Sequence, residues 1–167
     1  MEIVLWLGCG VTAIVASVLA ARSRRARLVG RVAVGTLMLA GGAAVNAAYL
    51  WSGLRDYAAF ADPAHFSWVT DLWRSVVAPN QVLFINLLIL FEAAAGVLVL
   101  TGGRRTQVGL LATIGFHLLL WLFGWIETVY VLVMLPALVL LLRAELRATA
   151  QVSGGHTSPT PSPAARS

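Results

Sequence analysis

The sequence predicts an all-α protein, a polytopic membrane helical bundle, and three observations support this class. Hydrophobic residues make up 59% of the 167 residues and charged residues only 11%, whereas soluble domains usually carry about 25% charged residues. The mean hydropathy is +0.84. Apolar residues gather in long runs, and most arginines lie at the ends of those runs. We therefore expect five transmembrane helices and one short amphipathic helix on the outer membrane surface.

Charge and cysteine usage narrow the class of partner and chemistry. The formal net charge is +5, and all 12 basic residues are arginines. Because arginines beside apolar runs set the orientation of membrane helices, we expect a lipid bilayer and no nucleic acid as partner. Cys9 is the only cysteine, which excludes an intrachain disulfide and a CxxC redox motif. No metal-binding signature occurs, so no metal ligands are assigned.

The first predicted span covers residues 3–21. No positively charged segment precedes this run, and a dense group of arginines follows it. That order is typical of a retained anchor rather than of a cleaved signal peptide. Residues 1–27 are therefore predicted to be an N-terminal membrane anchor followed by a basic cytoplasmic link.

The second predicted span covers residues 28–51 and carries a stripe of small and polar residues. At about 100° per residue the stripe falls on one side of the helix. Its members are Gly35, Gly42, Asn46, Tyr49 and Gly53. Small residues allow another helix to approach closely, and Asn46 can form a hydrogen bond across that contact. Two interpretations remain open, a helix-packing face and the wall of a ligand cavity.

The polar segment of residues 52–80 is expected to leave the bilayer core. Asp62 and Pro63 form a typical helix start, with Asp62 as N-cap and Pro63 at the first helical position. Apolar residues then recur at helical spacing, namely Phe66, Val69, Trp73 and Val76. We expect an amphipathic helix over residues 63–78 that lies on the outer surface and ends at Pro79. His65 is expected to be a solvated surface residue, and the tryptophans are expected to line an outward-facing vestibule.

Residues 81–125 are predicted to form a transmembrane hairpin with Arg104 and Arg105 at its turn. Glu92 lies about ten residues before the turn and His117 about ten residues after it. At about 1.5 Å per residue, the two side chains are expected at the same depth, near the bilayer midplane. Ionisable residues at that depth are costly and usually face a partner, a cavity or a pathway. The Glu92 and His117 pair is therefore the strongest candidate site.

Three interpretations remain open for this pair. The two side chains could hold helices together by pairing with each other or with Asn46, Asn86 or Thr113, at about 1 kcal/mol or less per contact. They could relay protons or bind the polar group of a small hydrophobic ligand such as a quinone. His117 could also ligate haem as a single axial ligand, because no second histidine lies in the middle of a span.

The last predicted span covers residues 126–142, after a break at Gly124, Trp125 and Glu127. With five spans and the N-terminus outside, nearly all arginines fall on the cytoplasmic side, as the positive-inside rule requires. The C-terminus is then cytoplasmic. Residues 148–167 are rich in Pro, Ser, Thr and Gly, and they are expected to form a disordered cytoplasmic tail.

Two segments resemble the DoxX-like family of integral membrane proteins. They are residues 31–41, RVAVGTLMLAG, and the stretch LLILFEAAAGVLVLTGGRRTQVGL. Glu92, Gly96, Gly102 and Arg104 stand at positions of the family pattern. The resemblance implies that residues 28–147 form a DoxX-like four-helix membrane domain. The chain departs from the family in having Asn46 and no lysine after the first glycines, and in its additional N-terminal span.

The resemblance implies an accessory or binding subunit of a bacterial cell membrane, associated with a redox partner protein. From the residues we expect a polar mid-membrane site that includes Glu92, His117, Asn46, Tyr49 and Asn86. One alternative is a membrane enzyme in which Glu92 and His117 relay protons for a quinone-like substrate. Another is a small-solute transporter, although no inverted repeat or broken helix pair is found. The sequence names no cofactor, ligand or substrate.

Overall fold

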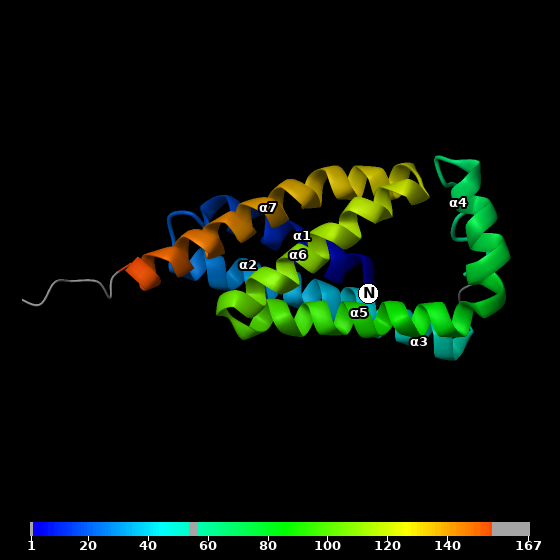
Figure 1. The fold of residues 1–167 in the computed structure, drawn as a ribbon, viewed down its shortest axis with the longest axis horizontal. Helices are drawn as coiled ribbons and strands as arrows, with labels where there is room; N and C mark the ends of the chain where they lie inside the picture. Colours follow the sequence, from blue (N-terminus) through cyan, green and yellow to red (C-terminus); the bar gives the residue numbers. More distant parts are fainter. Residues whose placement is uncertain (1, 54–56, 155–167) are drawn as a thin grey trace, which may run out of the picture.

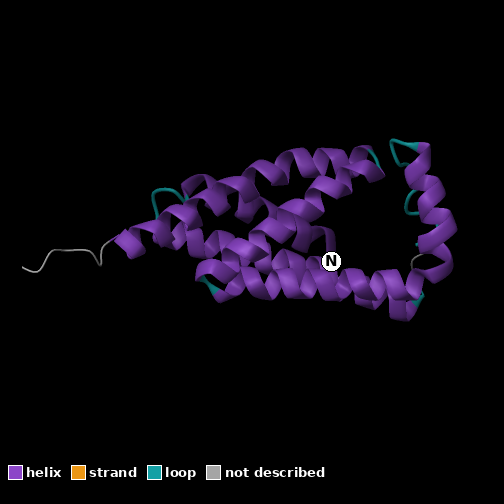
Figure 2. Ribbon diagram, viewed as in Figure 1, coloured by secondary structure: helices purple, strands orange, loops and turns teal. Residues whose placement is uncertain are grey.

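The computed structural model of this chain describes residues 2–53 and 57–154, and within these ranges it contains helices and turns but no strand (Figures 1 and 2). The N-terminal half comprises α1 (Glu2–Leu19), α2 (Arg24–Thr36), the π-helix η1 (Leu37–Ala44) and α3 (Val45–Ser52). Then follow α4 (Ser67–Leu72), the π-helix η2 (Trp73–Val77), the 3₁₀ turn η3 (Ala78–Asn80) and α5 (Gln81–Thr101). The chain continues through α6 (Gly103–Leu120), the 3₁₀ turn η4 (Trp121–Phe123) and α7 (Trp125–Gly154).

Four helical stretches of the described chain are long and apolar enough to cross a membrane. They are Arg24–Ser52, Ser67–Thr101, Gly103–Phe123 and Trp125–Gln151. A fifth apolar stretch, Trp6–Leu19 in α1, is shorter. The prediction of an all-helical bundle with apolar membrane-crossing helices is therefore confirmed, and a fifth span formed by α1 stays a prediction.

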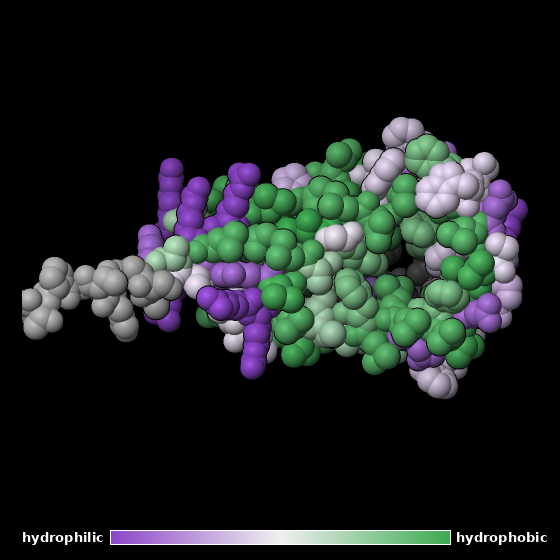
Figure 3. All heavy atoms as spheres, in the orientation of Figure 1, coloured by the Kyte–Doolittle hydropathy of each residue, from purple (hydrophilic) through white to green (hydrophobic). Residues whose placement is uncertain are grey.

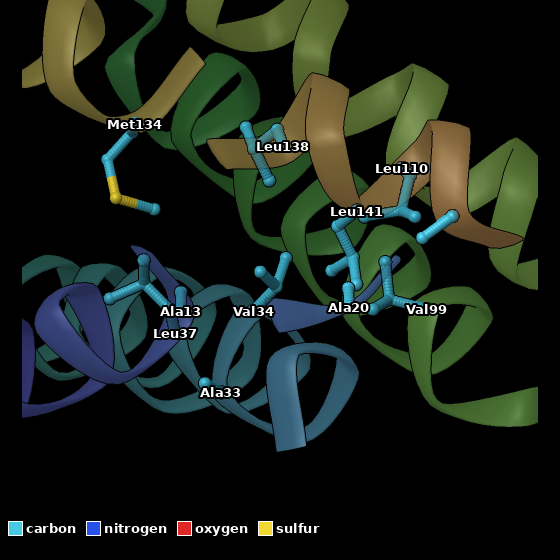
Figure 4. Packing of buried hydrophobic residues seen from close by; sticks show 11 residues of the cluster. Ala13, Ala20, Ala33, Val34, Leu37, Val99, Leu110, Met134, Leu138 and Leu141 are labelled. Atoms are coloured by element: carbon cyan, nitrogen blue, oxygen red, sulfur yellow. The ribbon is translucent and has the colours of Figure 1, made fainter. Parts of the chain in front are cut away.

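The hydrophobic core lies where α7 packs over the N-terminal helices. Met134, Leu138 and Leu141 recur at helical spacing along one face of α7, and each is at most 2% exposed. Figure 4 shows Met134 and Leu141 pointing toward residues of α1 and α2 such as Ala13 and Val34. Small side chains bring the helix backbones close enough for extensive van der Waals contact, which drives association of apolar helices.

Glycines set the crossings of α5 with its two neighbours. A Cβ atom on Gly35 would lie 2.6 Å from Leu100 Cγ and 3.2 Å from the Gly96 carbonyl oxygen. A Cβ atom on Gly109 of α6 would lie 2.7 Å from the Val99 backbone nitrogen. Both distances are shorter than a Cβ atom tolerates, so these crossings require glycine. The stripe that begins at Gly35 faces α5 and serves as a helix-packing face there.

Arg31 links α2 to the C-terminal end of α5. Its Nε donates to the Val99 carbonyl at 3.1 Å, and its Nη2 donates to the Leu100 carbonyl at 2.7 Å. The last carbonyls of a helix have no partner within the helix, so a guanidinium group satisfies two of them here. Gly102 turns the chain with φ of +91°, and the turn between α5 and α6 falls where the sequence predicts it.

The surface helix differs from its prediction in where it begins and ends. Residues 57–63 form turns, and α4 begins at Ser67 rather than at Pro63. Asp62 is not an N-cap, because its carboxylate forms a salt bridge of 2.9 Å with Arg74 in η2, about two helical turns after Ser67. Pro79 does not end the helix, because the 3₁₀ turn η3 carries the chain directly into α5. Figure 1 shows α4 lying across the end of the long helices.

Two further expectations are corrected in the described chain. His65 is half-buried rather than solvated, and its Nε2 lies 2.8 Å from Thr128 Oγ1. The last helix runs to Gly154, so residues 148–154 of the predicted tail are helical. Residues 155–167 lie outside the described part of the chain.

Candidate functional site

Glu92 and His117 both lie inside the bundle, on the facing arms of the α5–α6 hairpin. Glu92 is 5% exposed and His117 is 1% exposed. Few ionisable side chains of the described residues are buried to this extent. Glu92 and His117 also lie in helices that are apolar enough to cross a membrane. Such burial is costly unless each side chain finds hydrogen-bond partners or a function.

Glu92 is held by the helix that runs through η1 and α3. Asn46 Nδ2 donates a hydrogen bond of 3.0 Å to Glu92 Oε2. The other oxygen, Oε1, has no hydrogen-bond partner among the described residues. A Cβ atom on Gly42 would lie 2.6 Å from Oε1, so the carboxyl group rests directly on the backbone of η1. π-Helical segments frequently occur at functional sites.

A row of hydrogen bonds extends from Glu92 to the segment before α4. Tyr57 is 4% exposed, and its hydroxyl donates to the Asn46 Oδ1 atom at 3.2 Å and lies 3.3 Å from the Asn46 carbonyl oxygen. Trp73 Nε1 in turn donates to the Tyr57 carbonyl at 2.8 Å. We call Glu92, Asn46 and Tyr57 the Glu92 cluster. It connects the middle of α5 with the elements that cross the end of the bundle.

His117 belongs to a second group of polar side chains. Its Nδ1 lies 2.8 Å from the Thr113 carbonyl oxygen, and its Nε2 lies 3.3 Å from the Tyr130 hydroxyl. A carbonyl oxygen only accepts, so Nδ1 carries the proton, and in a neutral ring Nε2 accepts from Tyr130. The two rings are 5.3 Å apart between centroids. We call His117 and Tyr130 the His117 pair.

The two groups meet at consecutive glycines of η1. Trp6 packs edge-on against Tyr130, with ring centroids 5.3 Å apart. Its Nε1 donates to the Gly41 carbonyl at 3.1 Å, and the next residue, Gly42, supports Glu92. Trp6 therefore links the His117 pair to η1, next to the residue that supports Glu92.

The predicted site residues are only partly brought together. Glu92 and Asn46 are in direct contact, and no hydrogen bond of the described chain joins Glu92 to His117. Asn86 lies outside the cluster, because its Nδ2 donates to the Val82 carbonyl one turn back in α5, at 2.6 Å. Tyr49 is half-buried on α3. Within the described residues, no three His, Cys, Asp or Glu side chains come together as metal ligands do.

Sequence reasoning missed Tyr57, Tyr130 and Trp6. Tyr130 could have been found, because it follows the break at Gly124 by less than two helical turns and so returns to about the depth of His117. Tyr57 carried no such signal, since it lies in an irregular segment whose path depends on tertiary contacts.

Aromatic side chains close the end of the bundle next to the Glu92 cluster. We call this cluster of rings the aromatic cap. It consists of Phe60, His65, Phe66, Trp73, Trp121, Phe123 and Trp125. The backbone nitrogen of His65 donates to the Leu122 carbonyl at 3.0 Å. The expected vestibule is thus at least partly filled by ring contacts that tie the segment before α4 to the α6–α7 turn. Figure 3 shows the surface hollowed between this end and the middle of the bundle.

The arrangement places an acid, an amide, an imidazole and two phenols inside an otherwise apolar bundle. These groups can donate to and accept from the polar head of a hydrophobic molecule, and Glu92 Oε1 accepts no hydrogen bond from a described residue. Comparisons of the chain with protein-family models, curated proteins and solved structures gave no match.

Proposed function

We propose that the chain is a DoxX-like accessory or binding subunit of a cell membrane, which serves a redox partner and holds the polar head of a small hydrophobic ligand at Glu92. The observation that supports this most is a carboxyl group that is 5% exposed and accepts one hydrogen bond from a described residue, at Oε2. A carboxyl group kept only to hold helices together gains about 1 kcal/mol or less per contact. A ligand that forms a hydrogen bond with Oε1 would add to that gain.

The chemistry of the surroundings favours a quinone-like molecule. A carbonyl group can accept a hydrogen bond from a protonated carboxyl group, and a ring can pack among apolar helices. The His117 pair, which Trp6 links to η1, offers further hydrogen-bonding groups for the same molecule. The proposal retains the expected orientation, with the N-terminus outside and the C-terminus cytoplasmic. The arginines at 22–31, 104–105, 143 and 147, which fall on one side in this topology, support that orientation.

The row of hydrogen bonds from Glu92 through Asn46 to Tyr57 favours ligand binding over proton transfer, because its middle residue is an asparagine. Asn46 separates Glu92 from Tyr57, and an amide neither gains nor loses a proton near neutral pH. A relay from the end of the bundle to Glu92 would need an acid or base at that position. The row therefore suits the orientation of the carboxyl group better than the movement of protons.

The test combines identification of bound molecules with a binding titration. Protein purified in mild detergent is analysed by mass spectrometry, and a short-chain quinone is then titrated while tryptophan fluorescence is recorded. We expect saturable quenching, and we expect Glu92→Leu to weaken binding about tenfold, which corresponds to the loss of one hydrogen bond to a buried group. Glu145→Leu is the matched control, because Glu145 is 7% exposed and lies toward the C-terminal end of α7. Equal affinity in the wild type and Glu92→Leu would disprove the site.

A further inference from the structure

A groove lies between α1 and α2, away from the Glu92 cluster. Its volume is about 390 Å³. The lining residues from α1 are Gly8, Cys9 and Thr12, and those from α2 are Leu28, Val29, Val32, Ala33 and Thr36. The Thr12 hydroxyl is used within α1, where it donates to the Gly8 carbonyl at 2.7 Å. The lining is therefore mainly apolar, which suits a hydrocarbon chain.

Gly8 leaves one wall of the groove without a side chain. A Cβ atom added at Gly8 would meet nothing within 4 Å, so the space beside it is open. On the other wall Val29 and Val32 are 46% and 48% exposed, which leaves their side chains available to an occupant. The groove is thus an open surface groove between two packed helices.

Arginines stand at one end of the groove. Arg25 precedes Leu28 and Val29 by one helical turn and therefore lies on the same face of α2. Arg22, Arg24 and Arg25 are exposed, and none of them forms a salt bridge with a described carboxylate. Arg31, in contrast, is occupied by the carbonyls at the end of α5. The three free guanidinium groups offer an anion-binding site where the groove ends.

The length of the groove matches one leaflet of a bilayer. From Leu28 to Thr36 the helix rises about 12 Å at 1.5 Å per residue. The hydrocarbon of one leaflet is about 15 Å thick, half of the usual 30 Å. An acyl chain that fills the groove would therefore place its headgroup at the arginines.

We propose that the α1–α2 groove is a binding site for an anionic phospholipid. One acyl chain lies along the groove beside Gly8, and the phosphate group is held by Arg24 and Arg25, with Arg22 nearby. Guanidinium groups bind phosphate through paired hydrogen bonds as well as through charge. This site does not depend on the ligand proposed at Glu92.

A second copy of the chain fits the groove less well. Copies in one membrane share one orientation, so a neighbour docked on α1 and α2 would bring its own arginine-rich turn to the same depth. That arrangement places the arginines of the two copies side by side. No described carboxylate forms a salt bridge with these arginines, so their charges would repel one another. An anionic lipid instead neutralises the arginines.

Native mass spectrometry can test the site with the full-length protein. The protein in mild detergent is mixed with equal amounts of phosphatidylglycerol and phosphatidylcholine that carry the same acyl chains. We expect the wild type to retain phosphatidylglycerol preferentially. Each arginine near an anionic headgroup contributes about fivefold, so Arg24→Gln combined with Arg25→Gln should reduce that preference about 25-fold.

Two variants test the groove itself. Gly8→Phe fills the open space, and Val32→Phe fills it from the opposite wall in case the first variant alters the helix. Both should lose the retained phosphatidylglycerol. Gly115→Phe is the matched control, since a Cβ atom at Gly115 on α6 also meets nothing within 4 Å.

The charge control is Arg104→Gln with Arg105→Gln at the α5–α6 turn, where both arginines are exposed. Both control variants should retain phosphatidylglycerol as the wild type does. Three results would overturn the proposal: equal retention of the two lipids by the wild type, unchanged retention in both groove variants, and a dimer that both groove variants abolish.

Discussion

The substitution Gly42→Ala should separate the Glu92 carboxyl group from Asn46. The added Cβ atom would lie 2.6 Å from Glu92 Oε1 and 2.7 Å from its Cδ. The Glu92 side chain is flexible, so the carboxyl group, rather than the helix backbone, is expected to move. Its movement breaks the 3.0 Å hydrogen bond from Asn46 Nδ2 to Oε2. The variant therefore measures that bond without removing either partner.

The magnitude follows from comparison with Gly115→Ala. Replacing glycine by alanine inside a helix is favourable by about 1 kcal/mol, and this contribution is common to both variants. A Cβ atom at Gly115 meets nothing within 4 Å. A buried polar group that loses its partner costs about 1–3 kcal/mol. We expect the free energy of unfolding of Gly42→Ala to be about 1–3 kcal/mol below that of Gly115→Ala.

The assay is reversible unfolding in mixed detergent micelles, followed by circular dichroism. Glu92→Ala provides the second arm of a double-mutant cycle, because it removes the atoms that the new Cβ atom would meet. In that background Gly42→Ala should behave like Gly115→Ala. If the effects of Gly42→Ala and Glu92→Ala add within about 0.5 kcal/mol, the two sites are independent and the reasoning is refuted.

Three further outcomes are expected. Gly109→Ala should lower the free energy of unfolding by at least about 1 kcal/mol relative to Gly115→Ala in the same assay, because it meets the backbone of α5, which cannot move aside; equal stability of the two would contradict this crossing. A cysteine at Ser67, which is exposed, should react with a membrane-impermeant maleimide faster than one at Thr70, whose hydroxyl donates to the Ala61 carbonyl at 2.9 Å. Equal labelling rates would mean that α4 is turned differently. A reporter fused after Arg147 should be active only on the cytoplasmic side, and periplasmic activity would reverse the proposed orientation.

Hydrophobic runs and arginine positions predicted the long helices well, because burial of apolar surface and the cost of unpaired backbone in lipid leave few alternatives to a helix. The basic turn and the length of the apolar runs predicted the hairpin turn at Gly102 and the break at Gly124. Both glycines have positive φ, +91° and +139°. Local signals failed where tertiary contacts compete with them. Asp62 has the residue type of an N-cap, yet its carboxylate is taken by Arg74.

The sequence predicted several residues of the candidate site but not which of them form hydrogen bonds with each other. Depth placed Glu92 and His117 at one level, but depth contains no information on which way a side chain faces around its helix. The structure gives Glu92 the partner Asn46, one of the partners considered from the sequence, and gives His117 the partners Thr113 and Tyr130. The π-helical turns of η1 also escape a periodicity analysis, because it assumes 100° per residue throughout.

The aromatic cap has a consequence for the rates of ligand exchange. A ligand that reaches the Glu92 cluster from this end must first separate His65 from Thr128 and from the Leu122 carbonyl. Because the residues in these contacts do not bind the proposed ligand, the contacts slow its association and its dissociation by the same factor. Weakening them with His65→Ala would speed association and dissociation by the same factor while the dissociation constant stays unchanged. The cap thus acts on the residence time of the ligand, whereas Glu92 acts on its affinity.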